Sequence, residues 1–344
     1  MPPKKRATHR DVARRAGVSP AVVSYVINNG PRVTAPETRE RVLKAIAELS
    51  YQPNASARGL RGRRTHTIGF IAHDYHALDA FVSPYTAGIL TGVAAELKRR
   101  NHYVLVYPMV IGEDLAGVRA LVDGARVDGV IARLVEDSPV TDALLEVIAA
   151  AHIPCVCIER PAADRFRFSA VSYDDEGGAY DATRYLIAQS KRRIGYLQGD
   201  LRYTAARKRL NGYKRALIEQ GLSIDDALIQ GQAWSPSDAV DSVRCLLDLP
   251  DPPTAIFAAS DSLAFSAIEV LRERGLRVPD DIAVIGFDDT LIARDMRPAL
   301  TTMRIPLTDI GCLAAALVLR PTNAREDGVT LMNLPVEFVR RGTA

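Results

Sequence analysis

Residues 8–28, THRDVARRAGVSPAVVSYVIN, constrain the fold of this chain more strongly than any other stretch. Thr8 and Asp11 have the spacing of a capping box at the start of a helix, and Gly17 suits the left-handed backbone that ends one. Ser19 can then cap a second helix. Two short helices joined by such a tight turn predict a helix-turn-helix, whose second helix fits the major groove of DNA. An ordinary helical hairpin is the alternative that this spacing also allows.

A third helix is expected after this pair. Thr34 and Glu37 have the spacing of a second capping box, and the helix that they open is predicted to run to about Leu49. The apolar residues of the three helices recur at helical spacing and predict one small shared core. They are Val12, Ala13, Ala16, Val22, Val23, Val26, Ile27, Val42, Ile46 and Leu49. Residues 1–50 are therefore expected to form a small all-α head.

Net charge is divided unevenly along the chain. Residues 1–65 hold 14 lysines and arginines against 4 carboxylates, a net charge of +10, whereas the other 279 residues hold 30 against 37, a net charge of −7. A small basic module joined to a larger acidic one indicates that the basic end binds phosphates. Solubility alone would not concentrate the positive charge in the first fifth of the chain.

Residues 51–65, YQPNASARGLRGRRT, follow the head. Pro53 breaks the helical pattern, and residues 55–60 can form only a short helix. Gly59 weakens that helix by about 1 kcal/mol relative to alanine, so it should not be stable alone. We expect it to fold on a surface, and a flexible linker is the alternative for the free protein.

From Thr67 onwards, nearly continuous apolar segments alternate with helical stretches. The predicted strands lie within HTIGFIAHD, YVLVYPM, VDGVIARL, IPCVCIER, RRIGYLQGD, TAIFAAS and IAVIGFDD. Apolar strands that alternate with helices indicate doubly wound parallel sheets, and 344 residues provide about two such units after the head. The fold class expected is a helix-turn-helix head followed by an α/β core.

Polar residues follow several of these strands, at the edge where parallel sheets bind ligands. They include Asp74, Glu159, Asp200, Ser260, Asp261, Asp288 and Asp289. The sequence has no glycine-rich phosphate loop, no GxGxxG after a strand and no nucleophile elbow. A binding site is therefore expected in preference to an enzyme active site.

The chain offers little sign of metal binding, disulfides or membrane insertion. Its four cysteines lack disulfide or zinc spacing, and Cys155 and Cys157 are expected to be small core residues. His73 and His76 have no third ligand nearby, so we expect no metal and no cofactor. No apolar run reaches the roughly 18 residues of a membrane span, and MPPKKR does not begin a signal peptide. A soluble, cytoplasmic protein is expected.

Eight segments together resemble the lactose/galactose repressor (LacI/GalR) family of bacterial transcription factors over nearly the full chain. They are RDVARRAGVSPAVVSYVIN, YQPNASARGL, VDGVIA, DDEGGAYDATRYLI, RRIGYLQGD, AARKRLNGY, DSLAFSAIEVLRERGLRVPDDIAVIGFDD and RPALTTMRIP. The resemblance implies a homodimer on a pseudo-palindromic operator, and a core like that of periplasmic sugar-binding proteins that clamps a small effector. Leucine heptads that tetramerise some relatives are not found at the end of the sequence. The implied divisions are a head (1–50), a hinge helix (51–65), a first subdomain (about 66–167 and 305–330) and a second subdomain (about 168–304 and 331–344).

The resemblance also implies which head residues meet DNA. Pro20, Ala21 and Tyr25 match positions that read base edges, and Tyr25 departs from the arginine common in the family. Arginine can make a bidentate bond to guanine, whereas tyrosine offers one hydroxyl and a ring, so direct hydrogen-bond readout should be sparse. Phosphate contacts are expected from Thr8, Ser19, Ser24 and Asn28. An intrahelical hydrogen bond is the alternative for Ser24.

Leu60 matches the leucine of the family's hinge, which wedges into the minor groove at the operator centre. A pair of apolar side chains there can partly unstack a flexible step and bend the duplex. Ala57 and Arg58 would lie beside it. Moving the two hinge segments of a dimer apart would then abolish the bend and most of the affinity.

The effector site is implied by the same resemblance. Arg207 matches an effector-binding arginine, Asp288 a hydroxyl acceptor and Trp234 an aromatic platform for a sugar ring; a packed surface aromatic is the alternative for Trp234. Ser260 stands where asparagine is common and Ile305 where a polar residue sometimes contacts effector. These departures argue against assuming a relative's sugar. Further candidates on neighbouring loops are Asp74, Phe81, Asp174, Asp175 and Asp261.

The function expected is a sequence-specific DNA-binding regulator, a repressor of carbohydrate uptake or catabolism genes that a small mono- or oligosaccharide switches. One alternative keeps the DNA chemistry but uses a purine-like or protein corepressor. A solute-binding protein without regulatory role is a second, which the basic head disfavours. An enzyme is a third, which the lack of a nucleophile–base pair or cofactor loop disfavours.

Overall fold

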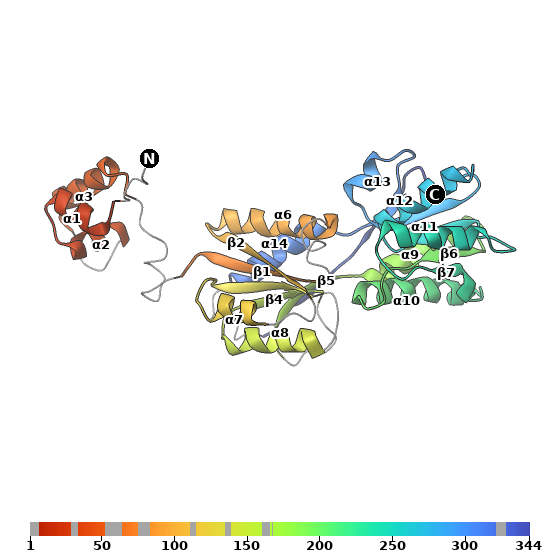
Figure 1. Cartoon of the computed structure of the whole chain (residues 1–344), viewed down its shortest axis with the longest axis horizontal. Helices are drawn as coiled ribbons and strands as arrows, with labels where there is room; N and C mark the ends of the chain where they lie inside the picture. The colour runs from red at the N-terminus through yellow and green to blue at the C-terminus, as the bar shows by residue number, and fades with distance from the viewer. Residues whose placement is uncertain are drawn as a thin grey trace. The chain divides into compact units, whose positions relative to one another are not determined.

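A computed structural model of the chain divides into two compact units, residues Met1–Thr65 and His66–Ala344 (Figure 1). The residues that it describes are 7–28, 34–51, 64–74, 83–110, 115–134, 139–159, 166, 168–320 and 328–344. Four residues predicted to bind DNA or effector, Ala57, Arg58, Leu60 and Phe81, lie outside these ranges together with the predicted hinge helix.

Three helices form the head: α1 (His9–Ala16), α2 (Pro20–Asn28) and α3 (Pro36–Glu48). The capping box of α1 is confirmed. The Asp11 amide donates to the Thr8 hydroxyl at 3.3 Å, and the Thr8 amide donates to the Asp11 carboxylate at 2.9 Å. Gly17 ends the helix with a φ of 66°, in the left-handed region. Val12, Val23 and Val42, one from each helix, are fully buried and close the predicted core.

The start of α3 differs from the prediction. Ala35, not Thr34, is the N-cap residue, and no side chain bonds a free amide there. Pro36 is the first helical residue; it has no N–H and fixes its own φ, so the helix starts with one donor fewer to satisfy. The capping box expected from Thr34 and Glu37 is therefore wrong.

The first subdomain of the larger unit is a six-stranded parallel sheet in the order β11-β5-β4-β3-β1-β2. Figure 1 shows α7 and α8 on one face of the sheet and α6 and α14 on the other, as in a doubly wound fold. The strands are β1 (Thr67–Asp74), β2 (Tyr103–Val110), β3 (Gly129–Arg133), β4 (Cys155–Ile158), β5 (Ser169–Tyr173) and β11 (Leu331–Leu334). The helices are α6 (Pro84–Arg99), α7 (Ala116–Val122), α8 (Pro139–Ala150) and α14 (Leu307–Val318).

The second subdomain is also a six-stranded sheet, in the order β12-β10-β9-β8-β6-β7, with only β12 antiparallel. Its strands are β6 (Ile194–Leu197), β7 (Ile229–Gln230), β8 (Ala255–Ala258), β9 (Ala283–Asp288), β10 (Thr301–Arg304) and β12 (Glu337–Val339). Its helices are α9 (Asp175–Ala188), α10 (Thr204–Glu219), α11 (Pro236–Leu247), α12 (Asp261–Glu273) and the short α13 (Leu291–Asp295). The predicted fold class is confirmed.

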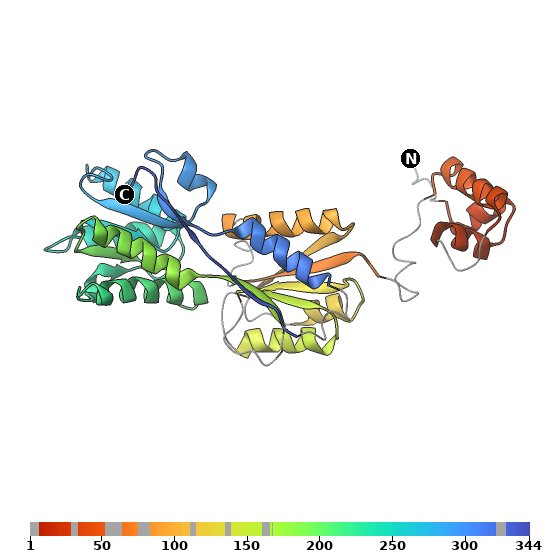
Figure 2. The ribbon, with the colours of Figure 1, turned by 180° about the vertical axis from the view of Figure 1, so that it is seen from behind.

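The chain crosses between the two sheets three times: after β5, after β10 and after β11. Figure 2 shows the C-terminal segment on its path from one sheet to the other. The second subdomain expected from the sequence comprises residues 168–304 and 331–344. However, β5 and β11 pair with each other as parallel neighbours in the first sheet, so those boundaries fall one strand too early.

Other expectations concern the core and the special groups. Cys155 and Cys157 are both buried in β4, as predicted. Within the described ranges, no helix is long and apolar enough to cross a bilayer. The same residues include no group of three His, Cys, Asp or Glu side chains placed to hold a metal ion.

Helices α6 and α14 lie very close together because a glycine of each helix faces the backbone of the other helix. A Cβ added to Gly92 would collide with the carbonyl oxygen of Thr308, and one added to Gly311 would collide with that of Ile89. We predict that Gly92→Ala lowers the free energy of unfolding by about 1–3 kcal/mol, because the helices must separate. Urea unfolding measures this change. Thr91→Ala, at the neighbouring exposed position, is the control and should change stability far less.

Candidate functional site

The residues predicted to meet DNA share the outer face of α2. Pro20 and Ala21 are exposed, and Ser24 and Tyr25 are half-buried, whereas Val23 on the opposite face is fully buried. Positions i, i+1, i+4 and i+5 of a helix lie on one side, so the four residues form one surface. This surface carries two apolar residues, a hydroxyl and a phenol, without a cation.

The predicted phosphate contacts fall at the helix ends. Thr8 is exposed and already caps α1, and Ser19 is exposed immediately before α2. Asn28 is the last residue of α2, and its side chain is outside the described part. The structure thus places Pro20, Ala21, Ser24 and Tyr25 on one side of α2, Ser19 at its start, and Thr8 at the start of α1. Their contacts with DNA stay a prediction.

Arg209, on α10, is the centre of the polar site in the second subdomain. It is 3 % exposed, and its Nε donates to Asp175 Oδ1 at 2.7 Å. One terminal nitrogen donates to the Ala259 carbonyl at 2.5 Å and lies 3.3 Å from Asp288 Oδ1. The guanidinium also stacks over the Phe287 ring, 3.9 Å from its centroid. Two carboxylates, one carbonyl and one ring therefore converge on a single cation.

Burial dominates the electrostatics of this cluster. It raises the pKa of Asp288 to about 8, although Arg209 opposes the shift and Asp261 and Asp175 add to it. Burial likewise raises the pKa of Asp175, again against the lowering effect of Arg209. Asp288 also holds a positive φ of 118°, an unfavourable conformation for a residue with a Cβ. Strained residues and shifted carboxyls at a strand end are typical of a ligand site.

Arg207, the arginine proposed from the sequence, does not belong to this cluster. It is exposed, and its terminal nitrogens donate to the carbonyls of Leu201 and Arg202 and to the Thr204 hydroxyl. Arg207 therefore ties the loop before α10 to the helix.

Helical spacing would have found Arg209 instead. The buried positions of α10 include Ala206 and Tyr213, and Arg209 lies three residues after the first and four before the second. A position between two buried residues at that spacing faces the core. The motif alone points to Arg207, which lies outside the Arg209 cluster.

Trp234 lies next to the Arg209 cluster. Its ring meets Tyr203 edge-on, with centroids 5.9 Å apart at 84°, and the Arg209 guanidinium lies 5.9 Å from the indole centroid. The indole nitrogen is buried and has no hydrogen-bond acceptor among the described residues. Trp234 is thus placed beside the site, while its role as a platform for a sugar ring stays a prediction.

The remaining candidates include several structural roles. Asp261 is 1 % exposed and accepts hydrogen bonds from the Thr302 hydroxyl at 2.6 Å and from the Thr290 amide at 2.7 Å; burial raises its pKa to about 6. Ser260 caps α12 and Asp174 caps α9 through their side chains. Asp74 ends β1, with its side chain outside the described part. Asp261 therefore has a structural role: its carboxyl group connects the segment after β9 to β10.

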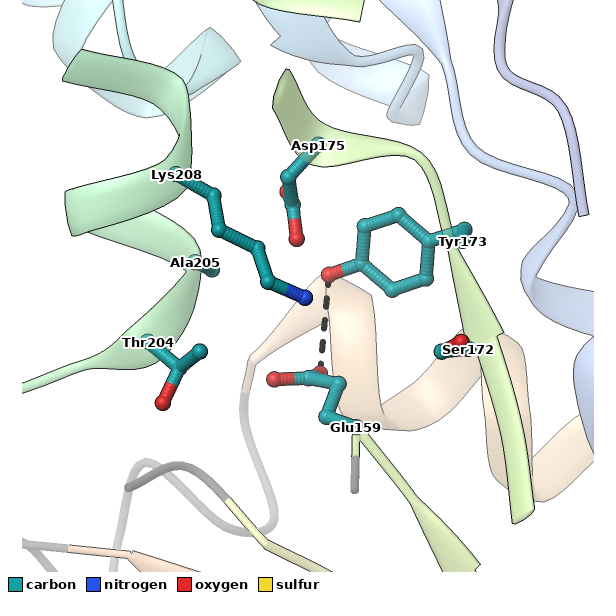
Figure 3. Close-up of a pocket in the computed structure, with 7 residues that line it drawn as sticks. All are labelled: Glu159, Ser172, Tyr173, Asp175, Thr204, Ala205 and Lys208. Atoms are coloured by element: carbon teal, nitrogen blue, oxygen red, sulfur yellow. Dashed lines mark hydrogen bonds between the residues drawn. The ribbon is translucent and has the colours of Figure 1, made fainter. Parts of the chain in front are cut away.

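A small recess lies beside the Arg209 cluster, where the chain passes from β5 to α9 (Figure 3). Its cavity volume is only about 10 Å³, and it is lined by Glu159, Ser172, Tyr173, Asp175, Thr204, Ala205 and Lys208. Glu159 comes from the first subdomain and accepts hydrogen bonds from Tyr85 and Tyr173. Glu159 is expected at a strand end from the sequence, whereas no local pattern marks Tyr173 or Lys208.

Comparison with known proteins covers both units. Residues 8–54 match the family described as bacterial regulatory proteins, lacI family, and residues 183–344 match the periplasmic binding protein-like domain. The chain is 35 % identical over 335 residues to the HTH-type transcriptional regulator CelR of Thermobifida fusca, covering 96 % of this chain and 97 % of that protein. It is 33 % identical to catabolite control protein A of Priestia megaterium, covering 95 % and 97 %.

Two solved structures are similar over nearly the whole chain. A complex of the transcriptional regulator CelR with cellobiose gives a TM-score of 0.74 at 33 % identity, covering 98 % of this chain and 100 % of that one. The lac repressor dimer bound to operator and the anti-inducer ONPF gives a TM-score of 0.85 at 27 % identity, covering 98 % and 99 %. The head and the two-sheet core are therefore shared with these proteins.

The buried ion pairs predict different costs for the two neighbouring arginines. Arg209→Met should lower the free energy of unfolding by about 3–5 kcal/mol, because it removes the cation paired with the buried Asp175 and leaves the Ala259 carbonyl and Asp288 without a hydrogen-bond donor. Arg207→Met, the matched control on the same helix, should cost less than about 1 kcal/mol, because its partners are near water. Urea unfolding of both variants checks this order. Equal losses would contradict the central position of Arg209.

The raised pKa of Asp288 predicts a pH-dependent stability. A carboxyl whose pKa is higher in the folded state stabilises the fold at low pH, and this contribution is lost as pH rises towards about 8. Asp288→Asn removes the titration, so its free energy of unfolding should fall less between pH 5.5 and pH 8.5 than that of the wild type. Asp241→Asn, at an exposed carboxylate on α11, is the control. Parallel pH profiles for Asp288→Asn and wild type would contradict the assignment.

Proposed function

Because the chain belongs to the lacI family of bacterial regulatory proteins and is a DNA-binding transcriptional regulator, not an enzyme, we propose that it represses genes of carbohydrate uptake or catabolism. In this proposal a small sugar controls its affinity for a pseudo-palindromic operator, which it binds as a homodimer. It would act in the cytoplasm, on the nucleoid. The proposal rests on one observation: the same chain carries a helix-turn-helix head and a two-sheet core with a buried polar cluster around Arg209.

The DNA-binding half of the proposal rests on the outer face of α2. Pro20 and Ala21 present apolar surface that fits thymine methyl groups, and the Tyr25 hydroxyl can make one hydrogen bond to a base edge. Arginines and lysines of residues 1–65 would supply the phosphate contacts. Ala57, Arg58 and Leu60 are proposed to enter the minor groove at the operator centre.

The effector half rests on the donors and acceptors around Arg209. Carboxylates and a guanidinium that converge at one edge suit a ligand with many hydroxyls. Trp234 and Tyr203 meet edge-on, so they do not form the parallel stack that a purine-like corepressor would favour. The CelR relative is bound to cellobiose in its structure, which makes a neutral glucoside the first effector to test.

The test measures binding to the promoter next to the chain's own gene at fixed salt, with and without a panel of mono- and disaccharides that includes cellobiose. We expect a specific shift that one sugar abolishes. Tyr25→Ala should weaken specific binding by a factor of about ten, the value of one base contact, and leave the salt dependence unchanged because no charge is lost. Specific binding that no sugar changes would favour a nucleobase or protein corepressor. No specific binding to any duplex would reject the proposal.

A further inference from the structure

Residues 51–65 join the head to the larger unit at one edge of the first sheet. His66 directly precedes β1, and because all six strands of this sheet are parallel, their first residues share that edge. The two strands beside β1 hold His66 in place: the Tyr103 amide donates to the His66 carbonyl at 2.7 Å, and the His66 amide donates to Asp128 at 2.8 Å. We call residues 64–66, 96–102 and 123–128 the linker edge.

The linker edge is positively charged, although the larger unit as a whole is negative. It holds five lysines and arginines against three carboxylates, a net charge of +2, whereas residues 66–344 have a net charge of −7. The cations are Arg64, Lys98, Arg99, Arg100 and Arg126, and the carboxylates are Glu96, Asp123 and Asp128. A local positive charge on an acidic unit indicates an anionic partner.

Two of these cations are available to such a partner. Lys98 and Arg126 are exposed, and neither makes a hydrogen bond or an ion pair with any residue that the structure describes. Arg99 and Arg100, in contrast, share the Glu96 carboxylate at 2.8 and 2.6 Å. A lysine in the last turn of α6 also suits the helix dipole, but Arg126 lies beyond the end of α7 and gains little from it. Helix stabilisation therefore does not account for both cations.

The length of the chain keeps the linker edge near the DNA that the head binds. Leu60 is proposed to enter the minor groove at the operator centre, and His66 follows six residues later. Six residues span at most about 20 Å when fully extended. Charges also act over a Debye length of about 10 Å at 0.1 M salt, and duplex DNA carries one phosphate charge per about 1.7 Å of its axis. The nearest dense anion is therefore the operator backbone.

We propose that the linker edge of each protomer binds phosphates of the operator through Lys98 and Arg126. The larger unit then adds a second DNA-binding surface to that of the head. This inference rests on the proposed operator binding and extends it. Phosphate contacts carry no sequence information, so this surface raises the affinity for every duplex and leaves the choice of sequence to α2. Because the surface belongs to the unit that holds the effector site, a change in that unit reaches the DNA directly as well as through the hinge.

The test is the salt dependence of operator binding by the full-length protein, measured for the wild type and for the double variant Lys98→Gln/Arg126→Gln. Each phosphate contact contributes about 0.9 to the slope of log K against log salt. Loss of two contacts in each protomer should therefore make the slope shallower by about 2–4, and should weaken binding at least about tenfold at 0.1 M salt. The urea midpoint should not change, because neither side chain has a partner among the described residues.

The matched control is Arg192→Gln/Lys214→Gln, which removes the same charge from the second subdomain. Both of its cations also lack a partner in the described part of the chain, and the wild-type slope is expected. Random-sequence duplex should show the same change of slope with Lys98→Gln/Arg126→Gln as the operator does. Equal slopes for this variant and wild type, or an equal change in the control, would overturn the inference and leave the repressor intact. No specific binding by the wild type would reject the proposed function, and this inference with it.

Discussion

One buried guanidinium holds together the ligand-facing edge of the second subdomain. Arg209 comes from α10, and its partners come from the start of α9 and the end of β9. Ionising either of the two buried carboxyl groups without a counter-charge would be costly, and desolvation raises the pKa of both against the lowering effect of Arg209. The shared cation makes their burial possible and fixes the relative position of three elements. The recess, the Trp234 ring and the strained turn after β9 are all arranged around it.

That turn is stabilised from both sides. Asp288 and Asp289 are adjacent residues with positive φ angles of 118° and 59°. Asp288 contacts Arg209, and the buried Asp289 carboxylate binds three arginines; burial acts to raise its pKa, but the hydrogen bonds from these arginines lower it. These are Arg294, Arg304 and Arg341, at 2.9, 2.7 and 2.5 Å. Strained backbone persists only where its surroundings over-determine it, and opposing ion pairs supply that constraint here.

The features that could be predicted from the sequence are those that neighbouring residues determine by themselves. Thr8, Asp11 and Gly17 define a helix by spacing and backbone preference alone, and apolar runs identify strands without knowledge of their partners. Contacts between distant segments were not accessible in this way. Nothing near Lys208 in the sequence shows that it lies close to Glu159, 49 positions earlier, and nothing in residues 331–334 shows that they pair with β5. Arg209 lies between these cases: the motif AARKRLNGY contains both Arg207 and Arg209, and only the helical spacing of α10 shows which of the two is buried.

The three crossings between the sheets are very short. Asp174 alone separates β5 from α9, Ile305 and Pro306 separate β10 from α14, and Pro335 and Val336 separate β11 from β12. Straps of one or two residues allow bending but little stretching or sliding, because either would pull residues out of paired strands. Bending at these three crossings is therefore the main relative motion that the connections permit. A small molecule that contacts both sheets would change mainly the angle between them. Its binding energy would therefore not be spread over many kinds of relative movement of the sheets.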